Sequence, residues 1–141
     1  MRIFEWNEMH AVHVLAVDDE HRQLFRLCDA LQRAMIAGAP TGQVQSIVAD
    51  LVIHAAHHFS HEEREMREAG YSLYAWHRRL HHAASSKVRV LERRIRRGDR
   101  DAVLELLDFL SGWLGDHIRL ADRMLGAYLR NHQRELTASV R

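Results

Sequence analysis

Apolar residues recur at steps of three and four along four stretches of the chain, a spacing typical of amphipathic helices. The predicted helices cover residues 18–37, 43–68, 73–97 and 100–130. Glycine, proline and other turn-forming residues separate them at 37–42, 70–72 and 98–99. Connections this short make neighbouring helices antiparallel. The sequence therefore predicts an all-α fold, an up-down-up-down four-helix bundle.

One face of each predicted helix carries the apolar side chains that we expect in the core. In chain order they are Leu24, Phe25, Cys28, Leu31, Met35, Val44, Val48, Leu51, Ala55, Met66, Leu73, Leu80, Ala84, Val88, Leu91, Ile95, Val103, Leu107, Leu110, Leu114, Ala121 and Leu125. Residues 1–17 contain Phe4 and Trp6 and are expected to form an N-terminal arm over the bundle. Residues 131–141 are expected to be a frayed polar tail. A chain of 141 residues predicts a single domain, 1–141.

Charge gives no general reason to expect nucleic acid or a membrane surface as a partner, because 20 Lys+Arg are nearly balanced by 19 Asp+Glu. The arginine-rich run at 93–100 is interpreted as a solvated helix end. No apolar stretch approaches the roughly 20 residues of a membrane span. The first 18 residues lack the pattern of a signal peptide. Together with a lone cysteine, Cys28, these features predict a cytoplasmic protein.

Histidine is unusually abundant, with 12 residues, and several histidines interrupt the apolar faces. A polar group on a core face is costly unless it is hydrogen-bonded or bound to a metal. One such histidine is usually explained by a hydrogen bond, but seven polar side chains on four faces favour a metal site. They are His21, His58, Glu62, His77, His81, His117 and Asp122. Imidazole and carboxylate ligands together suit iron, zinc or manganese.

The spacing of these residues predicts how they meet. At a rise of about 1.5 Å per residue, all seven fall in one layer of the bundle. Residues four apart share a helix face, as His77 and His81 do. His117 and Asp122 are five apart, or about 140° around an ideal helix. We therefore predict a distortion between them, such as a π-bulge.

The combined pattern resembles the haemerythrin family in its bacterial form. The matching segments are Phe4-Glu-Trp6, Asp18-Asp-Glu-His21, His58-Phe-Ser-His-Glu62-Glu63, Gly70-Tyr71, His77-Arg-Arg-Leu-His81 and Trp113-Leu-Gly-Asp-His117-Ile118 followed by Asp122. The resemblance implies a centre of two iron ions. One iron would take His77, His81 and His117, and the other His21 and His58. Glu62 and Asp122 would bridge them, together with an oxo or hydroxo group.

The resemblance also implies reversible dioxygen binding, at the position left open on the iron that has two imidazoles. The dioxygen pocket would be lined by Leu24, Phe59, Trp113, Leu114 and Ile118. The Glu-x-x-His pairs of ferritin-like enzymes and the His-Glu-x-x-His motif of zinc proteases do not occur in the sequence. We therefore expect a dioxygen-binding protein for storage, delivery or scavenging and not an enzyme. The alternatives are a sensor acting through a protein partner, or a di-iron enzyme of peroxide or nitric oxide chemistry.

Further histidines leave some alternatives open. They are His13, His54, His57, His61 and His82. His54/His58 and His57/His61 also have four-residue spacing, so the register is not unique; His58/Glu62 is preferred because it lies on the apolar face. We expect the additional histidines to be surface groups or outer neighbours of the ligands. The alternative is that His13, His54 or His82 orients ligands or relays protons. His10 and His132 are interpreted as incidental.

Overall fold

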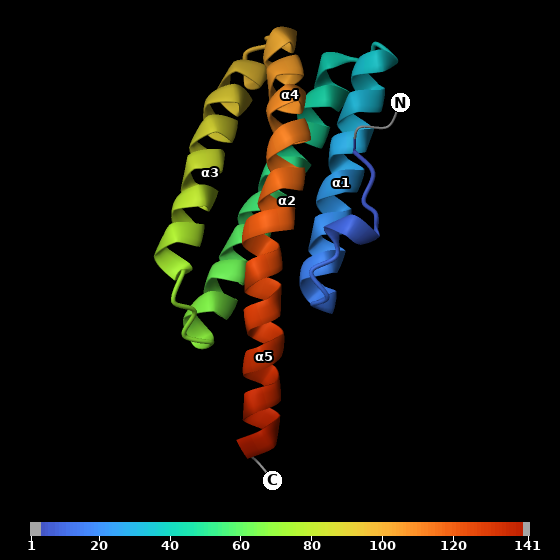
Figure 1. The fold of residues 1–141 in the computed structure, drawn as a ribbon. Coiled ribbons are helices and arrows are strands. Elements are labelled where there is room, and N and C mark those ends of the chain that lie inside the picture. Colours follow the sequence, from blue (N-terminus) through green and yellow to red (C-terminus); the bar gives the residue numbers. More distant parts are fainter. Residues whose placement is uncertain (1–3, 140–141) are drawn as a thin grey trace.

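Four long antiparallel helical segments lie side by side in the computed structural model, which describes residues 4–139 (Figure 1). The elements are η1 (Glu8–His10), α1 (Leu15–Ile36), α2 (Thr41–Glu68), α3 (Tyr74–Arg96), α4 (Arg100–His117), η2 (Ile118–Asp122) and α5 (Arg123–Ser139). α4, η2 and α5 follow one another without a break and form the fourth segment. Residues 4–139 contain no strand. The predicted all-α four-helix bundle is confirmed.

Turn and capping residues mark the ends of helices at the predicted loops. Gly70, at φ +66°, adopts a left-handed conformation after α2, which lets the Tyr71 N–H reach the carbonyl of Met66 at 2.9 Å. This closure satisfies a helix carbonyl that would otherwise lack a partner. At the next turn, the side chain of Asp99 accepts from the backbone N–H of Asp101 at 3.0 Å and caps α4.

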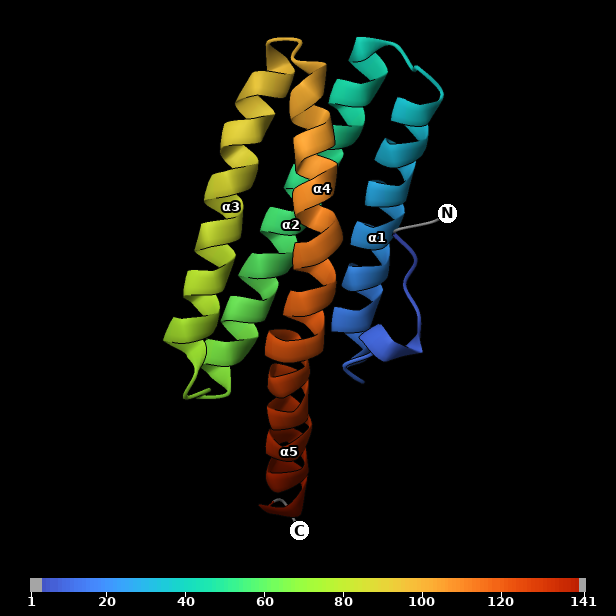
Figure 2. The same cartoon turned by 45° about the horizontal axis from the view of Figure 1, so that its top comes forward.

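Two predicted boundaries are wrong. The last helix does not end near residue 130 in a frayed tail but continues to Ser139, so α5 extends beyond the other helices (Figure 2). Residues 131–139 contain no glycine or proline, so nothing in them interrupts the helix. α1 begins at Leu15, three residues earlier than predicted, and Val14 before it offers no side-chain cap as a signal. The arm residues 1–3 and the tail residues 140–141 lie outside the described residues.

The core follows the predicted apolar faces, with Cys28 and Leu31 fully buried between the helices. On α4, Leu106 is fully buried, whereas the predicted Leu107 is only half-buried. The difference is a rotation of one residue, or about 100°, around the helix. Leu73 is exposed because it lies at the start of α3, at one end of the bundle. None of the helices in the described part of the chain combines the length and apolar character that a membrane span needs.

The N-terminal arm lies over the bundle, as predicted. Phe4 is buried in the main core. The buried carboxylate of Asp18 accepts from the backbone N–H groups of Val12 at 2.9 Å and His13 at 3.1 Å. From the other side, the guanidinium of Arg130 donates to the Val12 carbonyl. The arm is therefore held at Val12 between α1 and α5.

His10, interpreted above as incidental, holds the arm in place through packing and a hydrogen bond. Its ring is buried and packs on Phe25 with 4.9 Å between ring centroids. Its Nδ1 accepts from the backbone N–H of Asn7 at 3.1 Å, which completes the cap of η1. This contact could not be read from sequence because His10 lies outside every periodic apolar stretch.

The close approach of the arm to α5 gives a test of its docking. A Cβ atom on Gly126 would lie 2.6 Å from the carbonyl oxygen of Val12. We expect Gly126→Ala to lower the free energy of unfolding by about 1–3 kcal/mol, because the arm must move. The control is Gly112→Ala, where a Cβ would meet nothing within 4 Å; it should stabilise by about 0.5–1 kcal/mol. Urea unfolding followed by circular dichroism measures both, and equal changes would contradict the tight contact.

Candidate metal centre

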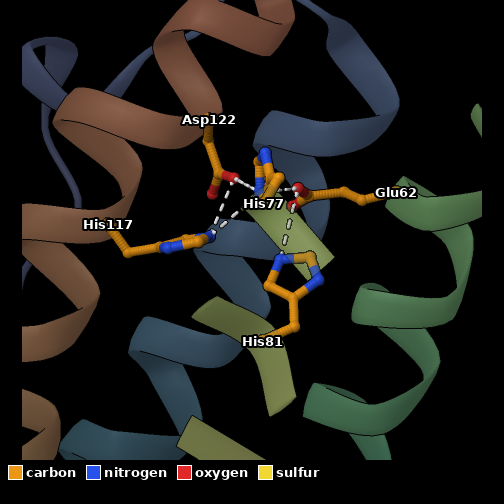
Figure 3. A group of neighbouring side chains, drawn as sticks. All are labelled: Glu62, His77, His81, His117 and Asp122. Atoms are coloured by element: carbon orange, nitrogen blue, oxygen red, sulfur yellow. Dashed lines mark hydrogen bonds and ion pairs between the residues drawn. The ribbon is translucent and has the colours of Figure 1, made fainter. Parts of the chain in front are cut away.

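All seven candidate ligands come together inside the bundle, and none of them is more than 7% exposed. α1 supplies His21, α2 supplies His58 and Glu62, α3 supplies His77 and His81, and the fourth segment supplies His117 and Asp122. They form two overlapping groups, Glu62–His77–His81–His117–Asp122 and His21–His58–Glu62–Asp122. Figure 3 shows the first group, with side chains from three segments pointing toward one another. The two groups share both carboxylates.

Asp122 divides its two oxygens between the groups. Its Oδ1 lies 3.0 Å from Nε2 of His77 and 3.1 Å from Nε2 of His117. Its Oδ2 lies 3.0 Å from Nε2 of His21, on the opposite side. One carboxylate therefore faces three imidazoles that belong to two different groups.

Glu62 divides its oxygens in the same way. Its Oε2 lies 3.3 Å from Nε2 of His77 and 3.8 Å from Nε2 of His81. Its Oε1 lies 3.5 Å from Nε2 of His21 and is close to Nε2 of His58. Both carboxylates thus present one oxygen to each imidazole group, which is the arrangement needed to bridge two cations.

The donor atoms also fit metal coordination better than hydrogen bonding. Adjacent ligands on an octahedral ion with bonds of about 2.1 Å lie about 3.0 Å apart, and Nε2 of His77 lies 3.2 Å from Nε2 of His117. Although these atoms are close, both oxygens of Glu62 and of Asp122, and Nε2 of His21, are buried with no hydrogen-bond partner. Buried polar atoms left unpaired are rare in folded proteins. Within each group the potential ligand atoms all lie within 4.8 Å of one another, close enough to share a cation.

Without a cation, the cluster holds protons. Burial opposes ionisation of Glu62, but the imidazoles around it, His58 first, hold its pKa well below the usual value. Burial lowers the pKa of His58, but the charge of Glu62 and a hydrogen bond to Glu20 raise it to about 10. The pKa of His77 rises to about 9 against the same effect of burial, through Asp122 and Glu62. For His81 burial dominates and lowers the pKa to about 4.

The predicted distortion between His117 and Asp122 is confirmed. Residues Ile118–Asp122 form one turn of π-helix, η2, in which the N–H of Arg123 donates to the carbonyl of Ile118, five residues earlier. The wider turn places residues five apart on one helix face. It thereby aligns His117 with Asp122, whose Nε2 and Oδ1 atoms lie 3.1 Å apart.

Two glutamates that the sequence reading did not select hold candidate ligands from outside. A single oxygen of Glu20 accepts from Nδ1 of His58 and from Nδ1 of His61, each at 2.8 Å. An oxygen of Glu63 accepts from Nδ1 of His81 at 3.0 Å. Such bonds to the far ring nitrogen fix the orientation of an imidazole and leave Nε2 free to bind a cation.

The five additional histidines differ in burial. His61 is half-buried and joins the outer hydrogen bonds through Glu20. His13, His54, His57 and His82 are exposed. His13 has φ +62°, in the left-handed region. In the described part of the chain the hydrogen bonds that orient His58 and His81 come from Glu20 and Glu63 and not from His13, His54 or His82. A proton relay through one of these histidines stays a prediction.

Aromatic rings and an apolar cavity lie beside the cluster. Phe59 stacks on His81 with 4.0 Å between centroids, and Trp113 stacks on His117 at 4.4 Å. Four of the five predicted pocket residues line a cavity of about 340 Å³, namely Leu24, Phe59, Trp113 and Leu114. The fifth, Ile118, does not line this cavity; it is 1% exposed and belongs to the main core.

A four-helix bundle with five imidazoles and two shared carboxylates at its centre defines a class of helical two-cation proteins. The family model described as Hemerythrin HHE cation binding domain matches residues 12–129. The chain belongs to the haemerythrin family.

Relatives match along most of the chain. The bacteriohemerythrin of Stenotrophomonas maltophilia (strain R551-3) is 28% identical over 132 residues, covering 94% of this chain and 85% of that protein. The myohemerythrin of Sipunculus nudus is 29% identical over 119 residues, covering 84% of this chain and 88% of that protein. A solved structure of wild-type hemerythrin has a TM-score of 0.82 at 24% identity, covering 89% of this chain and 96% of that one. The similarity to this structure extends to the whole bundle.

The hydrogen bond from Glu20 to His58 should matter for cation binding. We expect Glu20→Gln to weaken cobalt(II) binding by about ten-fold, because the neutral amide makes the imidazole of His58 less basic. Glu65→Gln is the matched control, because Glu65 lies 3.4 Å from Nε2 of His61 and has no contact with His58. Cobalt(II) titrations followed by visible absorption measure both variants. Equal affinity in the two would show that Glu20 does not support the site.

Cation binding should release protons. The pKa values of about 10 for His58 and about 9 for His77 lie above 7, so both imidazoles are protonated in the metal-free protein at pH 7. A cation binds only neutral imidazole, so loading must expel these protons, and affinity should rise as pH rises toward 9. The pKa of His21 is also raised, against the effect of burial, by Asp122 and Glu62. Zinc(II) calorimetry in two buffers of different ionisation enthalpy should therefore show release of at least two protons per chain. A heat independent of the buffer would contradict this protonation state.

Proposed function

We propose that this protein binds dioxygen reversibly at a centre of two iron ions. The observation that carries the proposal is the division of both carboxylates, since Glu62 and Asp122 each offer one oxygen to each imidazole group. A single cation would need only one group. Membership of the haemerythrin family supports iron as the metal. The mixed nitrogen and oxygen donors suit it.

The two ions would be held unequally. His77, His81 and His117 would bind one, while His21 and His58 would bind the other. The second group offers one imidazole fewer, which would leave a position for a small ligand. When bound, the iron pair would supply the reversible electron transfer that dioxygen binding requires. Glu20 and Glu63 would hold His58 and His81 in place from outside.

The apolar surroundings favour binding without further reaction. Phe59 and Trp113 cover His81 and His117, and Leu24 and Leu114 continue the same apolar wall. This wall lowers the polarity beside His81 and His117, while the cavity next to it opens to solvent. The alternative of peroxide or nitric oxide chemistry depends on His13, His54 or His82; all three are exposed, and His82 lines the cavity beside the cluster. Storage, delivery and scavenging of dioxygen all agree with this arrangement.

Iron loading tests the proposal directly. Anaerobic loading with iron(II) should give two ions per chain, and air should produce a visible charge-transfer band that disappears under vacuum. Asp122→Ala should bind at most one ion tightly, because it removes one of two bridging carboxylates. Metal analysis and absorption spectra provide both measurements. Saturation at one ion per chain, or a band that cannot be reversed, would overturn the proposal.

A further inference from the structure

The cavity above the cluster lies between α2, α3 and α4 and has a volume of about 340 Å³. Its inner end is formed by Phe59 and Trp113, the rings that stack on His81 and His117. Leu51 and Leu110 are buried along its wall. The outer end reaches exposed residues of α2 and α3, so a molecule in solution can enter.

Small side chains create this space. α2 contributes Ala55 and Ala56, and α3 contributes Ala84 and Ser85 on the facing side. Because these side chains are short, the space between the two helices stays open to solvent. An apolar cavity of about 150 Å³ already accommodates benzene. The cavity is therefore much larger than a diatomic gas requires, and about ten non-hydrogen atoms at roughly 30 Å³ each would fill it.

The mouth of the cavity carries an unpaired positive charge. The exposed Arg89 lines the mouth and donates from Nε to the carbonyl of Ser85 at 3.4 Å. Among residues 4–139, no carboxylate lies within salt-bridge distance of its guanidinium. Glu63, which also lines the cavity, already contacts His81 at 3.0 Å and Arg78 at 3.5 Å. An apolar interior with a free guanidinium at the entrance complements a molecule with an apolar body and one anionic end.

We propose that this cavity binds a medium-chain monocarboxylate of about eight carbons. The acyl chain lies between α2 and α3 with its end toward Trp113, and the carboxylate pairs with Arg89 at the mouth. A bound molecule would cover Phe59 and Trp113 from the α2–α3 side. The binding itself does not rest on dioxygen binding, so the two proposals can fail separately.

Octanoate, with ten non-hydrogen atoms, tests the proposal, and octanamide is its neutral counterpart of equal size. Trp6→Phe/Trp76→Phe leaves Trp113 as the only tryptophan, at the inner end of the cavity. Titration of this full-length protein should shift the fluorescence of Trp113 with octanoate, and octanamide should bind about ten-fold more weakly. Equal affinity for the acid and the amide, or no response to octanoate, would overturn the proposal.

Variants at the mouth locate the site. Arg89→Gln should weaken octanoate by about ten-fold and leave octanamide unchanged. Arg79→Gln, on the same helix and exposed but outside the cavity, is the matched control and should change neither. Ala56→Phe, at the exposed mouth, should abolish the fluorescence response, with thermal unfolding confirming that the variant folds. Equal effects of the two arginine variants, or an unchanged response in Ala56→Phe, would refute this assignment.

Discussion

Two buried carboxylates among five buried imidazoles are the constraint on which the rest of the molecule depends. Glu62 and Asp122 are almost completely inaccessible to solvent, and neither oxygen of either has a hydrogen-bond partner. Taking such groups out of water is costly unless positive charge compensates for them. The protein supplies that charge as protonated imidazoles or accepts it as cations. Its folding and its metal content are therefore thermodynamically linked.

This constraint explains why the backbone departs from regular geometry where it does. A regular helix would turn Asp122 about 140° away from His117. The π-helical turn η2 removes that angle, because its wider turn brings residues five apart onto one face. The same turn sits where the fourth segment passes the cluster, with regular helix before and after it. The distortion thus coincides with the place where this segment supplies two candidate ligands.

Most of the fold could be predicted because its information is local. Apolar faces with helical spacing and a glycine such as Gly70 at a helix end define segments without any long-range contact. The end of α5 was missed because residues 131–139 are polar, and polarity alone does not stop a helix. The start of α1 was missed because Val14 is not a capping residue. Where no capping or helix-breaking residue marks a helix boundary, the sequence carries no local signal for its position.

The seven candidate ligands could be selected because each interrupts an apolar face. Glu20 and Glu63 could not, because they lie off those faces and are recognised only by their distances to His58 and His81. The only available signal was that each precedes or follows a selected residue in the chain.

These outer contacts also make the two halves of the centre different. His81 and His117 lie beneath the stacked rings of Phe59 and Trp113. His58 instead connects through Glu20 to the partly exposed His61. The side with three imidazoles is therefore screened by aromatic rings, while the side with two is joined to the surface by hydrogen bonds. An environment divided in this way keeps the two halves chemically distinct even though they share both carboxylates.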